Sequence, residues 1–464
     1  MALTFYRPSN PSTTCYIDLL PPEIATLIWC FSDDEDLPNL RLVSLFWNDV
    51  ATPFWFQEVR LVFKRDSFQR LLNISRHPVI SKQVISLYYE PDELHEYVTQ
   101  DLWEERVSDS SYSEDVVADP APNASERDLR AWRRHITKIH ERPRHNFSKS
   151  FLKKAYKEYT RMYGEQEDLR KCEYGTKEFS DAMSRLPKLS EICMNYEGAI
   201  RPKGAKHAFA AGLLNAGGNH CGIPFMRSLL LAVHEAGIEL NVLELGRVDW
   251  RFLSQNDDIL KRVKRALNHL TTLGLDISTR KGETGNKLGV GIPTCRRYLS
   301  QNPKLIEFLA AAPNLKKLTI GFDFNEPFAP AELSQIFGST TWPYLESISL
   351  HCIDAVSENL NHFFNRHAST LKEVQMSFIR LQEGTWIKTL ENMKKDLNLK
   401  SALFGGELLG EHPHQHWKLW PRSWVALSDM QPQKNRTCKA IEDYLVQGGT
   451  CPLLDEDAHP QFEW

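Results

Sequence analysis

Three alternating histidines near the C-terminus are the first residues in this sequence whose type and spacing could do chemistry. His412, His414 and His416 lie in the run EHPHQHWK. Imidazole nitrogens bind zinc, but a zinc site usually needs four ligands in a fixed geometry. Pro413 interrupts the run, and no cysteine or acidic pair lies nearby at ligand spacing. We therefore predict a surface loop here and no metal site.

Other chemical motifs are weaker. Residues 282–287 resemble a phosphate-binding loop, but they lack the four-residue gap and the closing Lys-Ser or Lys-Thr of that motif. The sequence contains no G-x-S-x-G nucleophile elbow. Its 9 cysteines form no C-x-x-C pair, which is typical of reduced thiols. We predict a protein that is not an enzyme and has no cofactor, with an enzyme of unrecognised site as an alternative.

Composition indicates a folded protein with no specialised environment. The chain has 464 residues, is 42% hydrophobic and carries a formal net charge of -4, a balance that favours neither nucleic acid nor membrane. No run of about 18 apolar residues is present, and the first residues lack the apolar core of a signal peptide. We expect a soluble protein of the cytoplasm, the nucleus or both.

The stretch from residue 19 to residue 56 is patterned as three short helices. Pro21 and Pro22 suit a first helical turn, because proline fixes φ and has no N–H to donate. The apolar stripe of this first helix consists of Ile24, Leu27, Ile28 and Phe31. An acidic break follows, and the next stripe consists of Leu37, Leu40, Val43 and Trp47. Three short helices cannot bury all these side chains, so the surplus surface should dock on a partner or on the rest of the chain.

The same stretch resembles an F-box. The family pattern of Leu-Pro-x-Glu-Leu, a later Ile, then Leu, Val-Ser and Trp matches residues 20–24, Ile28, Leu37, residues 42–44 and Trp47. The resemblance implies a three-helix module that binds a Skp-family adaptor and, through it, a cullin. The residues that it assigns to adaptor binding are Leu20, Pro21, Glu23, Ile24, Ile28, Leu37, Leu42, Val43 and Trp47. Some of these must hold the module together instead, and the sequence does not divide them.

A second pattern repeats along the body of the chain. A leucine, an apolar residue three positions later and another two positions after that recur in order, with helical segments between them. The six frames are Leu189-Ile192-Met194, Leu240-Leu243-Leu245, Leu270-Leu273-Leu275, Leu315-Leu318-Ile320, Leu345-Ile348-Leu350 and Leu371-Val374-Met376. Each unit predicts a short strand and a helix that bury their faces only by stacking on neighbouring units.

These units resemble degenerate leucine-rich repeats, which implies an irregular solenoid arc. An ordinary α/β domain with leucine-rich strands is the alternative. In an arc, the side chains that flank the strand leucines face a partner. The possible target-facing residues are Glu191, Cys193, Asn195, Glu244, Asp276, Lys317, Thr319, Ser349, His351, Glu373 and Gln375. This mixed, slightly acidic set indicates a recognition face with no chemical site.

A charged insertion interrupts the repeats. Residues 90–126 contain 12 acidic residues and one Arg, and residues 127–161 contain 12 Lys or Arg and three acids. Aromatic and apolar residues in the basic half fall near helical spacing, from Trp132 to Met162. We expect charged helices packed on the arc, with the acidic and basic segments screening each other. A nuclear-localisation or RNA-binding interpretation exists for the basic half, but its acidic neighbour disfavours a nucleic-acid partner.

The predicted organisation has four parts. Residues 1–15 form a flexible leader and residues 16–56 the F-box. Residues 57–404 form the leucine-rich-repeat-like body, with the insertion at about 90–161, and residues 405–464 form a C-terminal cap. The order of these parts is similar to that in F-box proteins of filamentous fungi. The expected fold is α/β, a small all-α F-box joined to an irregular arc of strand-helix units.

The expected function follows from this organisation. The resemblance implies a non-catalytic substrate receptor of a Skp-cullin-F-box type ubiquitin ligase, which holds an unidentified protein target through the arc. An interaction scaffold without ubiquitination activity is the alternative.

Overall fold

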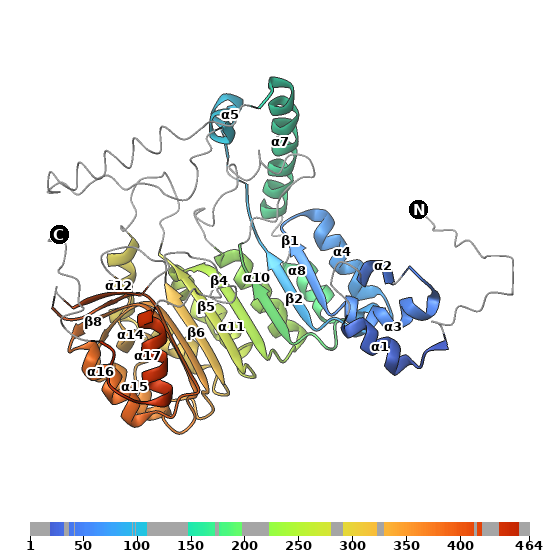
Figure 1. Cartoon of the computed structure of the whole chain (residues 1–464). Coiled ribbons are helices and arrows are strands. Elements are labelled where there is room, and N and C mark those ends of the chain that lie inside the picture. The colour runs from blue at the N-terminus through green and yellow to red at the C-terminus, as the bar shows by residue number, and fades with distance from the viewer. Residues whose placement is uncertain are drawn as a thin grey trace, which may run out of the picture.

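One ten-stranded sheet organises the molecule. The computed structural model describes residues 19–31, 37–40, 42–94, 96–97, 99–108, 147–171, 176–196, 222–279, 291–322, 329–412, 415–419 and 436–453. Within these ranges the chain is a mixed α/β structure (Figure 1). The expected α/β class is confirmed at this level.

The strands lie in the sheet in the order in which they occur in the sequence. All neighbouring pairs are parallel except the last, in which β10 runs antiparallel to β9. The strands are β1 (Glu58–Val62), β2 (Ser86–Glu90), β3 (Glu191–Met194), β4 (Val242–Asp249), β5 (Thr272–Ser278), β6 (Lys317–Phe322), β7 (Ser347–Val356), β8 (Glu373–Glu383), β9 (Ser401–Leu409) and β10 (His416–Leu419).

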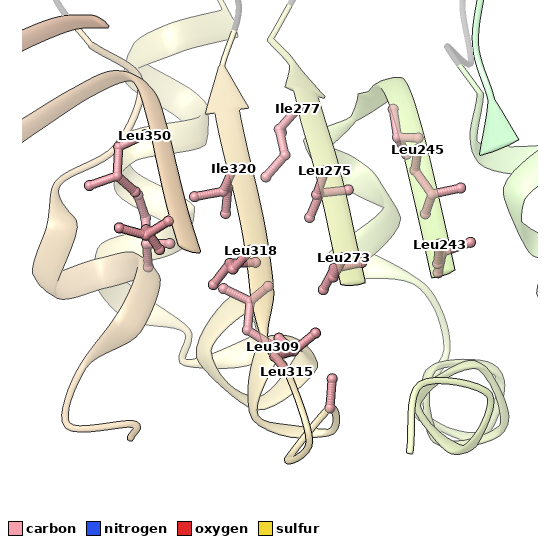
Figure 2. Close-up of a cluster of buried hydrophobic side chains, with 14 of the residues drawn as sticks. Leu243, Leu245, Leu273, Leu275, Ile277, Leu309, Leu315, Leu318, Ile320 and Leu350 are labelled. Atoms are coloured by element: carbon pink, nitrogen blue, oxygen red, sulfur yellow. The ribbon is translucent and has the colours of Figure 1, made fainter. Parts of the chain in front are cut away.

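The leucine frames explain the register of the sheet. Leu243 pairs with Leu273, which pairs with Leu318, and the same row continues to Ile348 and Val374. All five side chains are buried. Because successive strand residues point to opposite faces, the frames place their apolar side chains in one layer, and Figure 2 shows this layer from β4 to β7. The strands predicted from the frames are therefore confirmed.

The helices follow the strands and contribute to the same hydrophobic core. The helices after β1 are α4 (Arg65–Arg76), α5 (Gln100–Ser108), α7 (Lys149–Lys171), α8 (Thr176–Met183), α10 (Ile223–Ala236), α11 (Asp257–Arg265), α12 (Gly291–Gln301), α13 (Lys304–Ala310), α14 (Leu333–Phe337), α15 (Ser357–His367), α16 (Trp386–Asp396) and α17 (Arg436–Gln447). Short 3-10 helices are η2 (Ile80–Lys82) and η3 (Trp250–Ser254). All these α-helices except α5 place buried side chains in the core, although α7 contributes only Leu169. The sheet surface opposite this core is called the outer face below.

The charged insertion contains a second hydrophobic cluster. Helix α5 and the first part of α7 bury Trp103, Tyr159 and Met162 together, and Trp103 and Tyr159 pack with ring centroids 5.6 Å apart. The expected helix in the basic half is therefore present from residue 149. Trp132 lies outside the described residues. Figure 1 shows α5 and α7 projecting from the end of the sheet at β1 and β2.

One residue on each of the neighbouring strands β7, β8 and β9 has a positive φ angle, which is unusual in a strand. Cys352 and Phe378 adopt positive φ angles of 52° and 53°, and Gly406 on β9 has φ of 66°. A Cβ atom on Gly406 would lie 2.5 Å from the Phe378 ring, so only glycine fits there. The register of β8 with β9 shifts between Ser377 and Ile379, and a bulge of this kind changes the direction of the residues that follow it.

The C-terminal histidines differ from the prediction. His416 lies in β10, where it is 7% exposed, and its Nε2 is 3.1 Å from Oε2 of Glu407 on β9. The expected surface loop is therefore wrong at this residue, because Trp417 and Leu419 bury the segment against the sheet. His412 is exposed, and His414 lies outside the described residues. Among the described helices, none is long and apolar enough to cross a membrane.

Candidate protein-docking surfaces

The N-terminal helices enclose a small interior of their own. These are α1 (Pro22–Cys30), α2 (Leu37–Leu40) and α3 (Leu45–Trp55), which we call the N-terminal module. Trp47 and Ala51 of α3 and Ala25 of α1 are fully buried, yet they belong to neither hydrophobic cluster of the body. Ser44 caps α3, since its side chain accepts a hydrogen bond from the backbone N–H of Trp47 at 3.3 Å. One tryptophan therefore serves as the main interior side chain of the module.

Most of the exposed large apolar side chains of the described chain lie on this module. Nine of the twelve are found between residues 19 and 55, whereas the other three are scattered over the body. The nine are Leu19, Ile24, Leu27, Ile28, Phe31, Leu42, Val43, Leu45 and Trp55. Phe31 is 86% exposed and Leu42 is 82% exposed. Such a concentration of apolar surface on one small unit usually marks a protein-interaction site.

The structure divides the residues that the F-box resemblance assigned to adaptor binding. Ile24, Ile28, Leu42 and Val43 are exposed apolar side chains, and Pro21 and Glu23 are exposed beside them. Leu20 is half-buried, and the side chain of Leu37 lies outside the described residues. Trp47 is 0% exposed and packs inside the module, so it stabilises the helices and does not face a partner.

Sequence reasoning omitted five exposed large apolar residues from the adaptor-binding set. They are Leu19, Leu27, Phe31, Leu45 and Trp55. Leu27 and Phe31 belong to the same helical stripe as Ile24 and Ile28, so the helical period was a signal that could have found them. Leu45 opens α3 directly after the cap residue, where no periodicity marks its direction.

A second surface is formed by the outer face of the sheet. The eleven residues predicted to face a target alternate with buried leucine-frame residues on β3 to β8, as the two-residue period of a strand requires, except that Asn195 directly follows the end of β3. Glu244, Lys317 and Glu373 are exposed, and Ser349 is buried. The remainder are half-buried, namely Glu191, Cys193, Asn195, Asp276, Thr319, His351 and Gln375.

Pairing brings several of these outer-face residues into direct contact. Cys193 lies beside Glu244 in the register of β3 and β4, and its Sγ is 3.9 Å from a carboxylate oxygen of Glu244. Farther along, Thr319, Ser349 and Gln375 form one row across three strands. The row is made of hydroxyl and amide groups, which offer hydrogen bonds without charge.

His351 is the most perturbed group on this face. Its Nδ1 lies 2.5 Å from Oγ of Ser377, and its ring meets the Phe378 ring at 5.4 Å in an edge-on arrangement. Gly321 on β6 makes room, since a Cβ there would lie 3.1 Å from Cβ of His351. Burial lowers the pKa of His351 to about 4, because a charged imidazole loses hydration there. This part of the face is therefore uncharged at neutral pH.

A buried ion cluster lies beyond Cys352 and Phe378, toward the carboxyl ends of β7 and β8. Oδ2 of Asp354, a residue with 0% exposure, accepts hydrogen bonds from Arg296 at 2.9 Å, Arg380 and Gln382 at 3.0 Å. Arg296 belongs to α12, so the carboxylate joins that helix to two strands. The sequence contained no local signal for this cluster, because its members come from three separate elements.

Other parts of the described surface give weaker support for a function. An open groove of about 880 Å³ runs between α11 and α13 on the helical layer, and its walls carry the ion pairs Lys264–Glu307 and Lys304–Asp257. In the part of the chain that the structure describes, no group of three or more His, Cys, Asp or Glu residues could hold a metal ion. The sequence matches no protein-family model and no curated protein.

Proposed function

We propose that this protein is the non-catalytic substrate-receptor subunit of a Skp-cullin-F-box type ubiquitin ligase. In this role the N-terminal module is an F-box that binds a Skp-family adaptor, and the sheet is a leucine-rich-repeat-like arc that holds a protein target. The observation that carries the proposal is the concentration of exposed apolar side chains between residues 19 and 55.

The free energy gained by burying these side chains would stabilise a complex with a partner protein. Burying one large aliphatic or aromatic side chain that was exposed contributes roughly 1.5 to 3 kcal/mol. Leu42, Val43 and Phe31 are each more than half exposed, so together they could supply several times that value at an interface. A docking partner that covers them would account for their presence on a module of this size.

The order of the strands supports the repeat arc. Each parallel strand pairs with the strands that precede and follow it in the sequence, and the connecting helices pack on one face. Stacked strand-helix units bury a continuous core in this way and leave one sheet face available for recognition. The outer face from β3 to β8 is the surface that we assign to the target.

The mechanism that follows is proximity. A receptor without catalytic groups accelerates ubiquitin transfer by raising the effective concentration of the target near an enzyme that carries ubiquitin. Only Phe56 and Gln57 separate the end of α3 from the start of β1, so the link between the module and the sheet is short. A short link limits the distances at which the target can be held.

Binding to a purified Skp-family adaptor tests the proposal. Isothermal titration should detect a complex with the full chain, and Leu42→Asp/Val43→Asp should weaken it at least a hundredfold, because two apolar contacts are lost and two charges are introduced. Val79→Asp is a matched control, since Val79 is 52% exposed on the body. The control should bind the adaptor as the unmodified chain does. Failure of the unmodified chain to bind any adaptor would overturn the proposal.

Recruitment of the cullin separates a ligase subunit from a scaffold. A receptor should co-elute with adaptor and cullin as one ternary complex in size-exclusion chromatography. A complex with adaptor that excludes the cullin would instead favour an interaction scaffold without ubiquitination activity. The double variant should lose both proteins together, because the cullin reaches this chain through the adaptor.

A further inference from the structure

Helix α7 has two halves of different electrostatic character. In the second half, Arg161 pairs with Glu158 at 2.7 Å and with Glu165 at 3.3 Å. Arg170 pairs with Glu167 at 2.5 Å and with Glu93 at 3.1 Å. The cations of this half are thus compensated, apart from Lys171, whose nearest carboxylate is 4.0 Å away.

The first half carries four lysines and no acid. Residues 149–157 include Lys149, Lys153, Lys154 and Lys157, and all four are exposed. Within the residues that the structure describes, none of the four forms an ion pair. Lys149, Lys153 and Lys157 are spaced by four residues, so they lie along one side of the helix over about 12 Å. We call this set of four the lysine face.

The position and spacing of these lysines destabilise their own helix. Lys149 lies in the first turn, where a cation is unfavourable because the macrodipole is positive there, and the like charges of Lys149, Lys153 and Lys157, four residues apart, repel each other. Helix α11 has the ordinary arrangement, with Asp257 and Asp258 in its first turn and basic residues in its last. Helix α7 has no acidic residue in its first turn. Local rules broken without a gain in stability are typical of functional surfaces.

The lysine face stands on a rigid support. Nε2 of Gln166, a residue with 1% exposure, donates to the carbonyls of Phe63 at 3.1 Å and Asp92 at 3.0 Å, and its Oε1 accepts from the N–H of Leu94 at 2.8 Å. The backbone N–H of Arg65 also donates to Glu165 at 2.8 Å. These bonds fix the second half of α7 to the ends of β1 and β2, and the cluster around Trp103 fixes the first half to α5.

The screening expected between the acidic and basic segments involves residues 109–146, which lie outside the described residues. Glu104 of α5 accepts a hydrogen bond from Gln100 at 2.6 Å, and Glu93 pairs with Arg170 in the second half of α7. No ion pair joins α5 to the lysine face in the described ranges. The positive charge of this face is therefore directed at solvent.

We propose that the lysine face binds an acidic segment of a protein partner, and, resting on the proposed function, that this partner is the target. The charge of the face is complementary to carboxylates. About 12 Å of helix matches three or four residues of an extended peptide. The chain as a whole has a net charge of -4 and a pI near 6.5, which disfavours a long polyanion such as nucleic acid.

Fluorescence anisotropy with the full chain tests this inference, using fluorescein-labelled decaglutamate as the probe. The unmodified chain should bind the peptide at low salt, and Lys153→Gln/Lys157→Gln should weaken binding roughly fivefold, as expected for two exposed ion pairs. Lys261→Gln/Arg265→Gln removes the same number of exposed charges from α11 and should leave the affinity unchanged. Binding should also weaken as salt rises, because exposed charges are screened.

Three results would overturn the inference. They are no binding of decaglutamate by the unmodified chain, an equal loss in the α11 control, and tighter binding of a labelled 20-nucleotide RNA that decaglutamate does not displace. The last result would assign the face to nucleic acid.

A stability measurement separates a binding surface from a structural one. The Lys153→Gln/Lys157→Gln variant should keep or raise the melting temperature, because it removes repulsion from α7. A clear fall in melting temperature would also overturn the inference, because it would mean that the lysines support the fold. Adaptor binding should be unchanged in this variant, so a failure here is distinct from a failure of the proposed function.

Discussion

Nε2 of His367 accepts a hydrogen bond from the backbone N–H of Trp342 at 3.0 Å. Its Nδ1 lies 2.8 Å from the carbonyl of Phe363, which can only accept, so Nδ1 carries the proton and the ring is neutral. The imidazole also stacks on the Trp342 ring, with centroids 5.9 Å apart. One buried side chain thus fixes the loop before β7 to helix α15.

Replacing this histidine should destabilise the body. In His367→Phe the ring volume is largely kept, but the Trp342 N–H and the Phe363 carbonyl lose their side-chain partner. We expect a loss of about 2 to 3 kcal/mol in the free energy of unfolding, measured by urea denaturation. His362→Phe is the control, because His362 is 65% exposed on the same helix and should change stability by under about 0.5 kcal/mol. Equal effects of the two changes would contradict the assigned role of His367.

Stability should fall as the pH drops below about 6.5. Burial lowers the pKa of His351 to about 4 from an ordinary value of 6.5, so the unfolded chain binds a proton that the folded chain does not. Stability from this group is therefore complete above pH 6.5 and is lost progressively as pH falls toward 4. One pH unit within this window corresponds to about 1.4 kcal/mol.

The variant His351→Gln isolates this effect. It cannot titrate, so the stability gap between it and the unmodified chain should shrink by about 1 kcal/mol between pH 7 and pH 5.5. Urea midpoints at the two pH values give the measurement. Burial also lowers the pKa of His367, a residue present in both proteins, so its contribution cancels. A gap that does not change with pH would rule out a lowered pKa at His351.

Replacing Asp354 should reduce stability more than replacing most other acidic residues. Asp354→Ala leaves the guanidinium groups of Arg296 and Arg380 without their shared carboxylate, and breaking a buried pair costs about 3 to 5 kcal/mol. Asp257→Ala removes an ion pair whose carboxylate is 87% exposed and screened by solvent, so it should leave stability nearly unchanged. Thermal denaturation of both variants would compare them. A small loss at Asp354 would mean that solvent already reaches the cluster.

Trp47 should stabilise the N-terminal module alone. Trp47→Ala removes its main interior side chain, at a cost of about 3 to 5 kcal/mol to the module. Hydrogen exchange should then show lost protection from α1 to α3 and unchanged protection in β4 to β8, because Trp47 belongs to neither cluster of the body. Val43→Ala, an exposed change on the same module, should leave exchange in both regions as it was. Parallel loss of protection in the sheet would show that module and body unfold together.

Much of the sheet could be predicted because its signal is local and repeated. Leu273 and Leu318 stand in frames of the same spacing, and equal spacing becomes equal register when parallel strands stack. The same reasoning located the helices between frames, such as α11 and α15, since each strand needs a covering helix. These features depend on neighbours that are close in sequence.

The remaining features depend on partners that are distant in sequence. Gln166 looks like any polar helix residue, and its partners at Phe63 and Asp92 lie 103 and 74 positions away. Trp47 on α3 and Leu42 in the turn before α3 are both apolar, yet Trp47 is buried and Leu42 is 82% exposed. Three-dimensional packing decides between them, and an apolar period cannot. The positive φ of Phe378 also had no signal, because such backbone favours glycine.

The agreement between strand order and chain order has a consequence for biosynthesis. Each new strand finds its pairing edge already formed by the strand made just before it, so the sheet can grow from its N-terminal side as the ribosome releases the chain. The helices of the N-terminal module leave the ribosome before the sheet and do not need the body core to enclose Trp47. The edge of β9 stays unpaired until β10 pairs with it in antiparallel orientation, so chains truncated before β10 should aggregate more readily than the full chain.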